Sequence, residues 1–324
     1  MSSPAVSVIM PLYNCEHYVA AALDSLFAQT FPDFEVIVVD DGSTDRSAAV
    51  VERYTARDAR IKLIRQDNRG ISAARNAGLA HARGHAIAFL DPDDLWFPDK
   101  LERQLPLLTD MNLVYGAEVR VWDDDPGRVE GLSKSVDEIG NSDPLRSIMR
   151  KNSVWGPNTV MISRSLLEHH GGFDEEIRQA EDIDLWLRLA SSGVRFCHVP
   201  EPLGTYRIRA GSLTADRVSQ AKARVAVYEK LAARNGGANV GKRLAIRGGL
   251  ERSRRQLSRE LRARGYAQIA EGNGAPGRRT LRDSIAVTPF WWRCWVAAGI
   301  LIVPGAPRLL SALRAERYLA AGNS

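Results

Sequence analysis

The segment FLDPDD carries three carboxylates within four positions, directly after an apolar run of the chain. Asp91, Asp93 and Asp94 follow the residues HAIAFL, whose composition is typical of a buried strand. Carboxylates this close repel one another unless water, a basic side chain or a metal ion compensates their charge. Asp91 and Asp93 could both reach Mg²⁺ or Mn²⁺, cations that bind oxygen ligands and substrate phosphates. The alternative is a solvated acidic turn that begins the helix PDKLERQL, because helix N-termini favour acidic groups.

A second acidic pair ends another apolar run, in VVDDGSTD. Asp40 and Asp41 close a strand rich in β-branched residues, and Gly42 permits a tight turn after it. A carboxylate in this position can accept hydrogen bonds from a ribose hydroxyl or a base N–H group. The same segment can also supply an N-cap within residues 43–45 for the next helix. The two interpretations are compatible.

A basic residue, Arg75, stands next to Asn76 in the helical segment NRGISAARNAGL. This helix is expected to begin near the crevice that the acidic strand ends form. Arg75 could then pair with a nucleotide or with Asp40 and Asp41. A solvated arginine on the helix surface is the alternative.

Three acidic residues, Glu181, Asp182 and Asp184, begin the amphipathic segment EDIDLWLRL. The helix dipole alone favours acids in a first turn. A general base, however, requires just such a carboxylate at the rim of a cleft.

The segment TYRIRAGSLT is rich in hydrogen-bond donors. Guanidinium and hydroxyl groups suit phosphate oxygens. The donors in question are Arg207, Arg209, Ser212 and Thr214.

Strands and helices alternate through the first part of the chain. We expect strands within residues 6–14, 34–41, 61–66 and 85–94, and helices within residues 16–30, 45–57 and 71–83. This order predicts a doubly wound parallel sheet with helices on both faces. Ligands bind beyond the carboxyl ends of such strands, where the two acidic clusters should converge.

The alternation weakens after Leu101. We expect a strand within 112–125, a helix within 142–152 with Ser142 or Asp143 near its N-cap, and a strand and short helix within 158–175. A helix at 181–193 and a strand pair at 196–208 should follow. The chain then continues as Arg-rich helices at 219–235 and 252–270, after which GNGAPG breaks the helical pattern. Ile183, Leu185, Trp186 and Leu189 should face the core.

Charge divides the chain into two parts. The 324 residues are 44% hydrophobic and 26% charged, which is ordinary for a globular protein but long for one core. From Arg217 onward there are 21 Lys and Arg residues against 6 Asp and Glu residues, a formal charge of +15, and the rest carries −10. We therefore expect an acidic domain over 1–215 and a basic helical region over 216–324 that meets an anionic surface. Nucleic acid is not an expected partner, because no nucleic-acid-binding motif accompanies the charge.

The chain is expected to work in the cytoplasm, peripherally at the inner face of the membrane. It begins without a signal-peptide pattern, and its three scattered cysteines fit a reducing compartment. Near its end, Trp291, Trp292 and Trp295 flank Arg293 beside an apolar run that is short for a membrane span. Such a segment fits a membrane interface. A helical pair packed on the catalytic domain or in a dimer is the alternative.

Over about residues 5–215 the ordered motifs resemble the inverting family 2 glycosyltransferases, which have the GT-A fold. The motifs are VSVIMPLYN, SLFAQTFPDFEVIVVDDGSTD, NRGISAARNAGL, AFLDPDDLWFPDKL, GGFDE, EDIDLWLRL and YRIRAGSLT. The resemblance implies a Rossmann-like, mostly parallel sheet, with a nucleotide-sugar half at about 1–110, an acceptor half at about 111–215 and an α-helical C-terminal appendage. Pro92 departs from the small polar residues common in the middle of the family's metal motif, but proline stiffens the turn without removing a ligand.

The resemblance also implies residue roles. Asp93 would be the direct metal ligand, with Asp91 contacting the metal through water or contacting the ribose, and Asp182 would be the catalytic base. The nucleotide pocket would comprise Pro11, Tyr13, Asn14, Asp40, Asp41, Arg75 and Asp91. The acceptor or phosphate side would include Trp155, Asp174, Glu181 and Arg207.

The implied reaction moves a sugar from a nucleotide-sugar donor, expected to be a UDP-sugar, to a hydroxyl of a glycan or lipid-linked acceptor in polysaccharide or glycolipid biosynthesis. Asp182 would remove the hydroxyl proton, and one displacement would invert the anomeric centre with Mg²⁺ or Mn²⁺ as cofactor. A sugar nucleotidyltransferase should carry a glycine- and arginine-containing loop after its first strand, which PLYNCEHY lacks. A catalytically inactive carbohydrate- or membrane-surface-binding protein is the alternative of another class.

Overall fold

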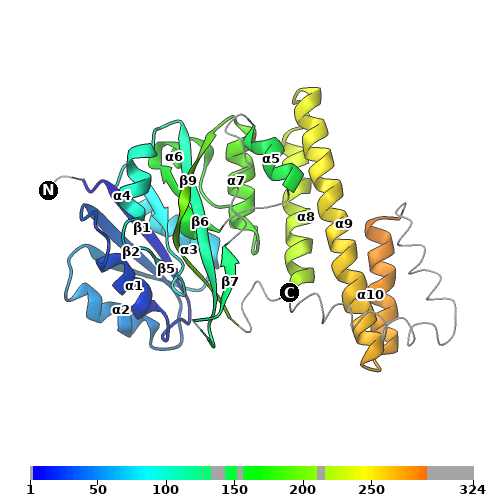
Figure 1. Ribbon diagram of the computed structural model, residues 1–324, viewed down its shortest axis with the longest axis horizontal. Coiled ribbons are helices and arrows are strands. Elements are labelled where there is room, and N and C mark those ends of the chain that lie inside the picture. Colours follow the sequence, from blue (N-terminus) through cyan, green and yellow to red (C-terminus); the bar gives the residue numbers. More distant parts are fainter. Residues whose placement is uncertain (1–2, 126, 133–142, 152–155, 210–215, 290–324) are drawn as a thin grey trace. The chain divides into compact units, whose positions relative to one another are not determined.

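The computed structural model describes residues 3–125, 127–132, 143–151, 156–209 and 216–289 (Figure 1). The chain divides into two compact units, Met1–Ala215 and Asp216–Ser324. Several residues considered above, namely Ser142, Trp155, Ser212, Thr214 and the tryptophans of the tail, lie outside the described residues.

The first unit alternates strands and helices as far as β4 and then changes character (Figure 1). Its elements are β1 (Val6–Leu12), α1 (Val19–Phe27), β2 (Phe34–Asp41), α2 (Ser47–Thr55), β3 (Ile61–Gln66), α3 (Ile71–His81), β4 (Ala86–Phe89), β5 (Leu95–Trp96), α4 (Lys100–Gln104), β6 (Asn112–Trp122), β7 (Val129–Leu132), α5 (Pro144–Lys151), β8 (Met161–Ser163), α6 (Arg164–His170), α7 (Glu181–Ser191) and β9 (Arg195–Ile208). Two single 3₁₀ turns lie at Leu105–Leu107 and Pro157–Thr159.

One sheet runs through the unit in the order β3-β2-β1-β4-β8-β6-β9-β5, with β7 paired to β6. The strands β1 to β4 are mutually parallel, so their carboxyl ends share one edge. Beyond β4, strand β8 runs antiparallel to both β4 and β6, whereas β9 is parallel to β6. The predicted Rossmann-like α/β architecture is confirmed.

Side chains of a strand alternate between the two faces of the sheet, and those of β1 are buried on both faces. Helices therefore cover both faces of the parallel part. Val8 and Met10 of β1 share a core with Leu23 of α1. Ile9 points the other way, toward α3, where a Cβ on Gly78 would lie 2.5 Å from the Ile9 Cγ2 atom. Only glycine therefore lets α3 approach the sheet this closely.

The region 196–208 corrects one prediction. The expected strand pair is a single strand, β9, of 14 residues. Its pairing with β6 shifts register between Gly116 and Ala117, which lie opposite Val199 and Pro202. The segment PEP, which suggests a turn, instead forms an irregularity within one strand, where a missing proline N–H is tolerated.

Two helices within residues 111–215 follow their predicted patterns. Asp143 caps α5, since its Oδ1 accepts a hydrogen bond from the Arg146 backbone N–H at 2.9 Å. The predicted core face of α7 is buried as expected. Its members are Ile183, Leu185, Trp186 and Leu189.

The second unit is helical: α8 (Arg217–Arg234), α9 (Val240–Ala270) and α10 (Gly274–Val287). The predicted break between helices is present, with Gly272 at φ +88°, but α10 was not predicted. Helices α9 and α10 approach each other so closely that a Cβ atom on Gly277 would lie 2.7 Å from the Gly265 carbonyl oxygen. Among the described residues, no helix is both long and apolar enough to cross a bilayer.

A buried carboxylate, Glu35, ties the amino-terminal ends of the central strands together. It is 2% exposed, accepts hydrogen bonds from Ser7 Oγ at 2.8 Å, and pairs with Lys62 Nζ at 2.9 Å and Arg83 Nη2 at 2.8 Å. Burial disfavours the charged form, but the bonds from Arg83 and Lys62 outweigh it and lower the pKa of Glu35 to about 2. A lowered folded-state pKa stabilises the fold above the unfolded-state pKa, and this stability is lost as the pH falls toward 2.

Replacing Glu35 with glutamine is therefore expected to lower the free energy of unfolding by about 2 to 3 kcal/mol at pH 7. The difference in the free energy of unfolding between the two proteins should shrink as the pH is lowered from 5, because the wild type then loses the stability that ionised Glu35 contributes. Urea unfolding of both proteins across this pH range tests the prediction. Glu168→Gln, at an exposed ion pair, is the matched control and should change stability by less than about 0.5 kcal/mol. A deficit that does not depend on pH would contradict the linkage.

Candidate active site

Two loops at the carboxyl edge of the sheet are fastened to each other through Asn14. Its Oδ1 accepts a hydrogen bond from the Thr44 backbone N–H at 2.8 Å, and its own N–H donates to Ser43 Oγ at 3.1 Å. Asn14 adopts φ +49°, a left-handed conformation that asparagine tolerates better than most residues. Of its predicted neighbours in a nucleotide pocket, Pro11 is buried within β1, whereas the Tyr13 side chain is 48% exposed and accessible to a ligand.

The pair at the end of β2 is buried and shapes the adjoining loops. Asp40 Oδ1 accepts from the Ser43 N–H at 3.0 Å, and Gly42 takes φ +74°, as the predicted tight turn requires. Asp41 accepts from the backbone N–H groups of Arg69 at 2.9 Å and Gly70 at 2.8 Å. Asp40 thus fixes the turn after β2, and Asp41 fixes the loop that leads into α3.

The expected N-cap of α2 is displaced. The helix begins at Ser47, and Asp45 Oδ1 accepts a hydrogen bond from the Ser47 N–H at 2.9 Å. Asp45 therefore supports the helix start from just outside it. Its second oxygen accepts from the Glu16 N–H at 3.1 Å, which adds a further tie between the loops after β1 and β2.

Arg75 connects the acidic turn after β4 with α7. It is 1% exposed, so the solvated alternative is wrong. Its Nη2 lies 2.8 Å from Asp91 Oδ1 and its Nη1 lies 2.5 Å from Glu181 Oε1, while the guanidinium carbon sits 5.1 Å from the centre of the Phe173 ring. Burial lowers the pKa of Arg75, but the charges of Asp91 and Glu181 outweigh it and the pKa is raised. One permanent cation therefore holds two carboxylates from elements far apart in the chain.

The acidic turn after β4 is held in place by hydrogen bonds and ion pairs. The Asp94 N–H donates to the Asp91 carbonyl at 3.1 Å, and the buried Asp94 Oδ1 accepts from the Arg207 N–H at 2.9 Å. Asp93 pairs with Arg209. Burial, then the charge of Asp91, raises the pKa of Asp93 despite Arg209, and burial raises that of Asp94 well above its ordinary range. The solvated-turn alternative fails, because Asp91 and Asp93 are only 24% and 19% exposed and α4 begins later, at Lys100.

Asp182 lies in the first turn of α7, next to the residue that pairs with Arg75. The preceding Ala180 adopts φ +65°, a strained conformation for alanine of the kind that clusters at functional sites. Asp182 is half-buried, and its Oδ1 accepts from the Ile183 N–H at 2.7 Å. Burial, followed by the charge of Glu181, raises the pKa of Asp182 to about 7, against the opposing charge of Arg75.

The carboxylates fit a divalent ion shared with substrate. Within the described residues, no group of three or more His, Cys, Asp or Glu side chains is placed to hold a metal ion. Asp91 and Asp93 therefore supply two carboxylates at most. Mg²⁺ and Mn²⁺ are often bound by one or two carboxylates together with substrate phosphates. Asp91 and Asp93 lie two positions apart in one turn, and a bound cation would offset the repulsion between their charges.

Of the residues expected on the acceptor or phosphate side, three lie within the described part of the chain, namely Asp174, Glu181 and Arg207. Asp174 closes its own turn, its carbonyl accepting from the Ile177 N–H at 3.1 Å. Glu181 is engaged with Arg75, as described above. Arg207 Nε donates to the Asp93 carbonyl at 2.9 Å, so it braces the acidic turn.

Two features of the site were not predicted. Glu118 on β6 is 7% exposed, and burial raises its pKa to about 7. Tyr18 donates its hydroxyl to Asp123 Oδ2 at 2.7 Å and faces the basic end of β9. A single acid within the apolar strand VYGAEVRVW was the only signal for Glu118.

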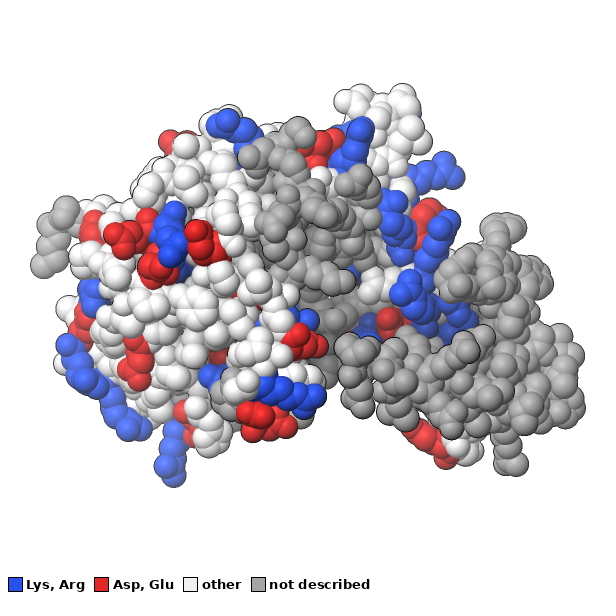
Figure 2. All heavy atoms as spheres, in the orientation of Figure 1, with Lys and Arg blue, Asp and Glu red and all other residues white. Residues whose placement is uncertain are grey.

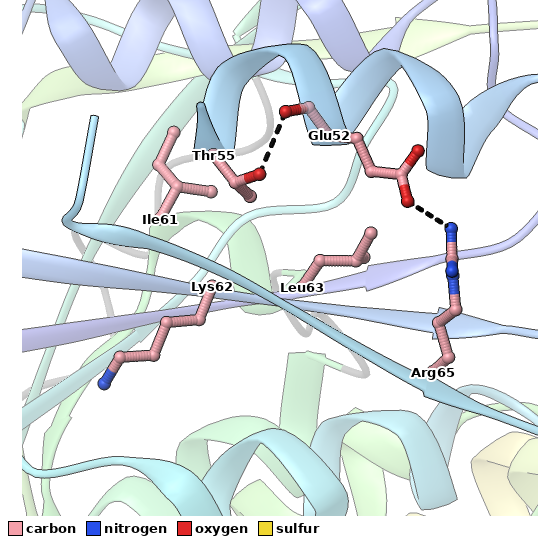
Figure 3. Close-up of a pocket in the computed structure, with 6 residues that line it drawn as sticks. All are labelled: Glu52, Thr55, Ile61, Lys62, Leu63 and Arg65. Carbon is pink, nitrogen blue, oxygen red and sulfur yellow. Dashed lines mark hydrogen bonds and ion pairs between the residues drawn. The ribbon is translucent and has the colours of Figure 1, made fainter. Parts of the chain in front are cut away.

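A separate hollow between α2 and β3 shares no residue with this site (Figure 3). Its charged members are already paired, Arg65 with Glu52 at 2.7 Å and Lys62 with Glu35 at 2.9 Å. It lies along the edge strand of the sheet, so we assign it no function.

Comparisons with known proteins agree with this geometry. Residues 7–171 match the glycosyl transferase family 2. TuaG of Bacillus subtilis, a glycosyltransferase assigned to teichuronic acid biosynthesis, is 33% identical over 233 residues, 70% of this chain and 88% of TuaG. WfgD of Escherichia coli, a UDP-Glc:alpha-D-GlcNAc-diphosphoundecaprenol beta-1,3-glucosyltransferase, is 31% identical over 226 residues, 68% of this chain and 84% of WfgD. The solved mannosyltransferase PcManGT from Pyrobaculum calidifontis, in complex with GDP-Man and Mn²⁺, has a TM-score of 0.61 at 23% identity and covers 96% of this chain and 88% of its own.

Proposed function

Because the chain belongs to glycosyl transferase family 2 and has the GT-A fold, it is a glycosyltransferase, and we propose that it moves a sugar from a UDP-sugar to a hydroxyl of a glycan or lipid-linked acceptor. The observation that carries the proposal is the position of Arg75, which joins Asp91 at the strand end to Glu181 beside Asp182. A donor-binding carboxylate and a candidate base are thereby held in one rigid arrangement.

Asp182 acts as the general base. A carboxylate whose pKa is raised to about 7 accepts a proton more readily than an ordinary aspartate and is still largely ionised slightly above neutrality. It removes the acceptor hydroxyl proton as the oxygen attacks the anomeric carbon from the face opposite the leaving nucleotide. The configuration inverts in this single displacement, so no second nucleophile is required.

Asp91 and Asp93 hold the divalent ion, and Arg75 keeps Asp91 in position. When bound, Mg²⁺ or Mn²⁺ supplies positive charge that stabilises the departing nucleoside diphosphate. Tyr13, Asn14 and the loop fixed by Asp41 would line the nucleotide. PcManGT, bound to GDP-Man and Mn²⁺, supports the use of a metal by this fold.

The acceptor class is inferred from the relatives. WfgD transfers glucose from UDP-Glc to a diphosphoundecaprenol-linked sugar, and TuaG is assigned to teichuronic acid biosynthesis. We therefore place this chain in polysaccharide or glycolipid biosynthesis, with UDP-sugar as donor and a lipid-linked sugar as acceptor.

A screen of donor hydrolysis and transfer tests the proposal. Purified protein is incubated with Mn²⁺ or Mg²⁺ and with UDP-, GDP- or dTDP-sugars, with and without lipid-linked disaccharide acceptors, and released nucleoside diphosphate is measured. We expect release with at least one UDP-sugar and its loss when the metal is chelated. Release from GDP-sugars alone would overturn the UDP assignment. No turnover with any donor, together with retained glycan binding, would favour the inactive binding protein.

The basic unit supports a second proposal, contact with an anionic membrane. Between Asp216 and Pro289 there are 17 Lys and Arg residues against 6 Asp and Glu residues. Figure 2 shows basic side chains gathered over the α8–α9 region with few acidic ones among them. Arg252, Arg255 and Arg259 lie on one exposed face of α9, at spacings of three and four residues. Each basic residue near an anionic bilayer contributes about 1 kcal/mol.

Reversing the charge of Arg252, Arg255 and Arg259 together to glutamate is expected to weaken binding to phosphatidylglycerol-containing vesicles at least about tenfold. Co-sedimentation at moderate ionic strength measures the affinity. A triple variant of exposed arginines in the first unit, Arg46→Glu, Arg53→Glu and Arg57→Glu, has the same net charge and should retain binding. Equal losses in both variants would show that net charge alone, and not this face, is responsible.

A further inference from the structure

Arg209 occupies the position where a cation is expected. It lies directly after β9, and its Nη2 forms an ion pair with Asp93 Oδ2. Asp93 is the residue assigned above as the direct metal ligand. In the free protein, then, one carboxylate of the acidic turn is neutralised by the chain itself.

The ring of Tyr18 holds Arg209 in this position. The Arg209 guanidinium carbon lies 4.8 Å from the centre of the Tyr18 ring, within the range of a cation–π interaction. Tyr18 is fixed in turn by its hydroxyl, which donates to Asp123 Oδ2 at 2.7 Å. The resting place of Arg209 is therefore constructed by side chains from distant parts of the first unit.

Arg209 differs from its neighbour Arg207 in the use of its Nε donor. Arg207 Nε donates to the Asp93 carbonyl at 2.9 Å, and its Nη1 lies 3.4 Å from Asp123 Oδ1. Arg209 Nε, in contrast, is buried without a hydrogen-bond partner among the described residues. A buried donor left unpaired costs about 1 to 3 kcal/mol, so this N–H group is available to an acceptor such as a phosphate oxygen.

A divalent ion on Asp93 cannot coexist with Arg209 in its present place. A unit charge and a double charge about 4 Å apart repel each other by about 8 kcal/mol at an effective dielectric constant of about 20. An anion between them removes this repulsion, and the forked guanidinium is well suited to phosphate oxygens. The diphosphate of a donor supplies such an anion.

We propose that Arg209 is an internal counter-cation that occupies Asp93 in the free enzyme and transfers to the donor diphosphate when the metal binds, so that metal and nucleotide bind with positive coupling. The proposal rests on the nucleotide-sugar function above and extends it. Removing Arg209 should open Asp93 to metal in the absence of nucleotide and also remove a contact to the diphosphate. Because coupling is reciprocal, UDP should then raise Mn²⁺ affinity less, and Mn²⁺ should raise UDP affinity less.

Calorimetry with Mn²⁺ alone, UDP alone and each in the presence of the other measures this coupling without any turnover. In the wild type we expect UDP to strengthen Mn²⁺ binding at least about tenfold. In Arg209→Gln we expect Mn²⁺ alone to bind at least threefold more tightly than in the wild type, and the strengthening by UDP to fall below threefold. Arg209→Lys keeps a cation at the position and should restore much of the wild-type coupling.

Two control variants make the result specific. Arg207→Gln removes the same charge from the same neighbourhood without touching the Asp93 carboxylate, and Arg46→Gln removes it from a distant exposed position; neither should tighten Mn²⁺ binding as Arg209→Gln does. Tyr18→Leu removes the ring that holds Arg209 and should shift Mn²⁺ binding in the same direction, which provides a second test if Arg209→Gln fails to fold.

The outcomes separate this proposal from the function on which it rests. If the wild type binds UDP more tightly with Mn²⁺ but Arg209→Gln binds Mn²⁺ alone no better, the counter-cation role is overturned and the glycosyltransferase assignment stands. If the wild type shows no coupling between Mn²⁺ and any nucleoside diphosphate, the proposed metal-dependent function itself fails.

Discussion

Replacing Asp182 with asparagine is expected to lower kcat by a factor of about 10³, within the range that general base catalysis supplies. The asparagine side chain has nearly the same shape but cannot take the acceptor proton. Binding of UDP should change less than threefold, because Asp182 acts on the acceptor hydroxyl. Initial rates with saturating donor and acceptor, together with calorimetry of UDP, measure the two effects.

The pH dependence of the wild type follows from the same residue. The base must be deprotonated, and the pKa of Asp182 is raised to about 7 by burial and by Glu181. The value of kcat/KM should therefore rise about tenfold per pH unit below pH 7 and level off above it. A profile that is flat between pH 5.5 and 8 would contradict this assignment.

The stability of the Asp182→Asn variant separates a catalytic defect from a folding defect. A carboxyl group whose folded-state pKa lies above its unfolded-state value destabilises the fold at high pH, and this cost disappears at low pH. At pH 8 the variant should therefore have a Tm equal to or above that of the wild type. Asp99→Asn, at an exposed position paired with Arg103, is the control and should keep kcat within twofold.

Replacing Asp93 with asparagine is expected to lower kcat/KM by a factor of about 10² to 10³, since a catalytic metal contributes several kcal/mol of charge stabilisation. An amide is a weaker ligand for Mg²⁺ or Mn²⁺ than a carboxylate. Arg209 would also lose its partner. At metal concentrations below the millimolar range, the variant should thus bind UDP no more tightly than without metal, whereas the wild type should bind it more tightly with metal.

Calorimetry and rate measurements across a metal titration check this prediction. A partial rescue of Asp93→Asn at millimolar Mn²⁺ is expected, because Asp91 still offers one carboxylate. Asp283→Asn, which removes an exposed charge from α10, should leave both the rate and the metal requirement unchanged. Wild-type activity of Asp93→Asn with undiminished metal dependence would place the ion elsewhere.

The first part of the fold was predictable because its signals are local. Each parallel strand is an apolar run that ends in turn-forming residues, as Asp40, Asp41 and Gly42 end β2. The order of the strands beyond β4 carries no such signal, because β8 inserts between β4 and β6 through pairing of residues distant in sequence. The segment PEP suggested a turn, and only the pairing with β6 shows that β9 continues through it.

In the helical unit, too, local signals were predictable and contacts between distant residues were not. The Arg-rich segments at 219–235 and 252–270 were expected to be helical, and they coincide with α8 and with the second part of α9. Helix α10 was missed because it begins with glycines and a proline, which are ordinarily signals of a loop. Proline is compatible with the first turn of a helix, and Gly277 is required by the close approach of Gly265, a contact invisible in the sequence.

The types of the site residues were predictable, but their partners were not. The positions of Asp91, Asp93 and Asp182 followed from their motifs. The ion pair of Arg75 with Glu181 joins residues 106 positions apart, so neither motif alone indicates it. Likewise, nothing local indicates that Arg209 would settle on Asp93, because that contact depends on how β9 ends beside the turn after β4.

The most direct test of the account is to locate the metal. Crystals of the protein grown with Mn²⁺ and a non-hydrolysable UDP-sugar, measured at the manganese absorption edge, give an anomalous peak that identifies the metal and its position. We expect one peak at coordination distance from an Asp93 oxygen, about 2.2 Å, with the diphosphate on its other side and Arg209 moved from Asp93 to the phosphates. A manganese peak and nucleotide in another cavity, with Asp93 still paired to Arg209, would contradict it.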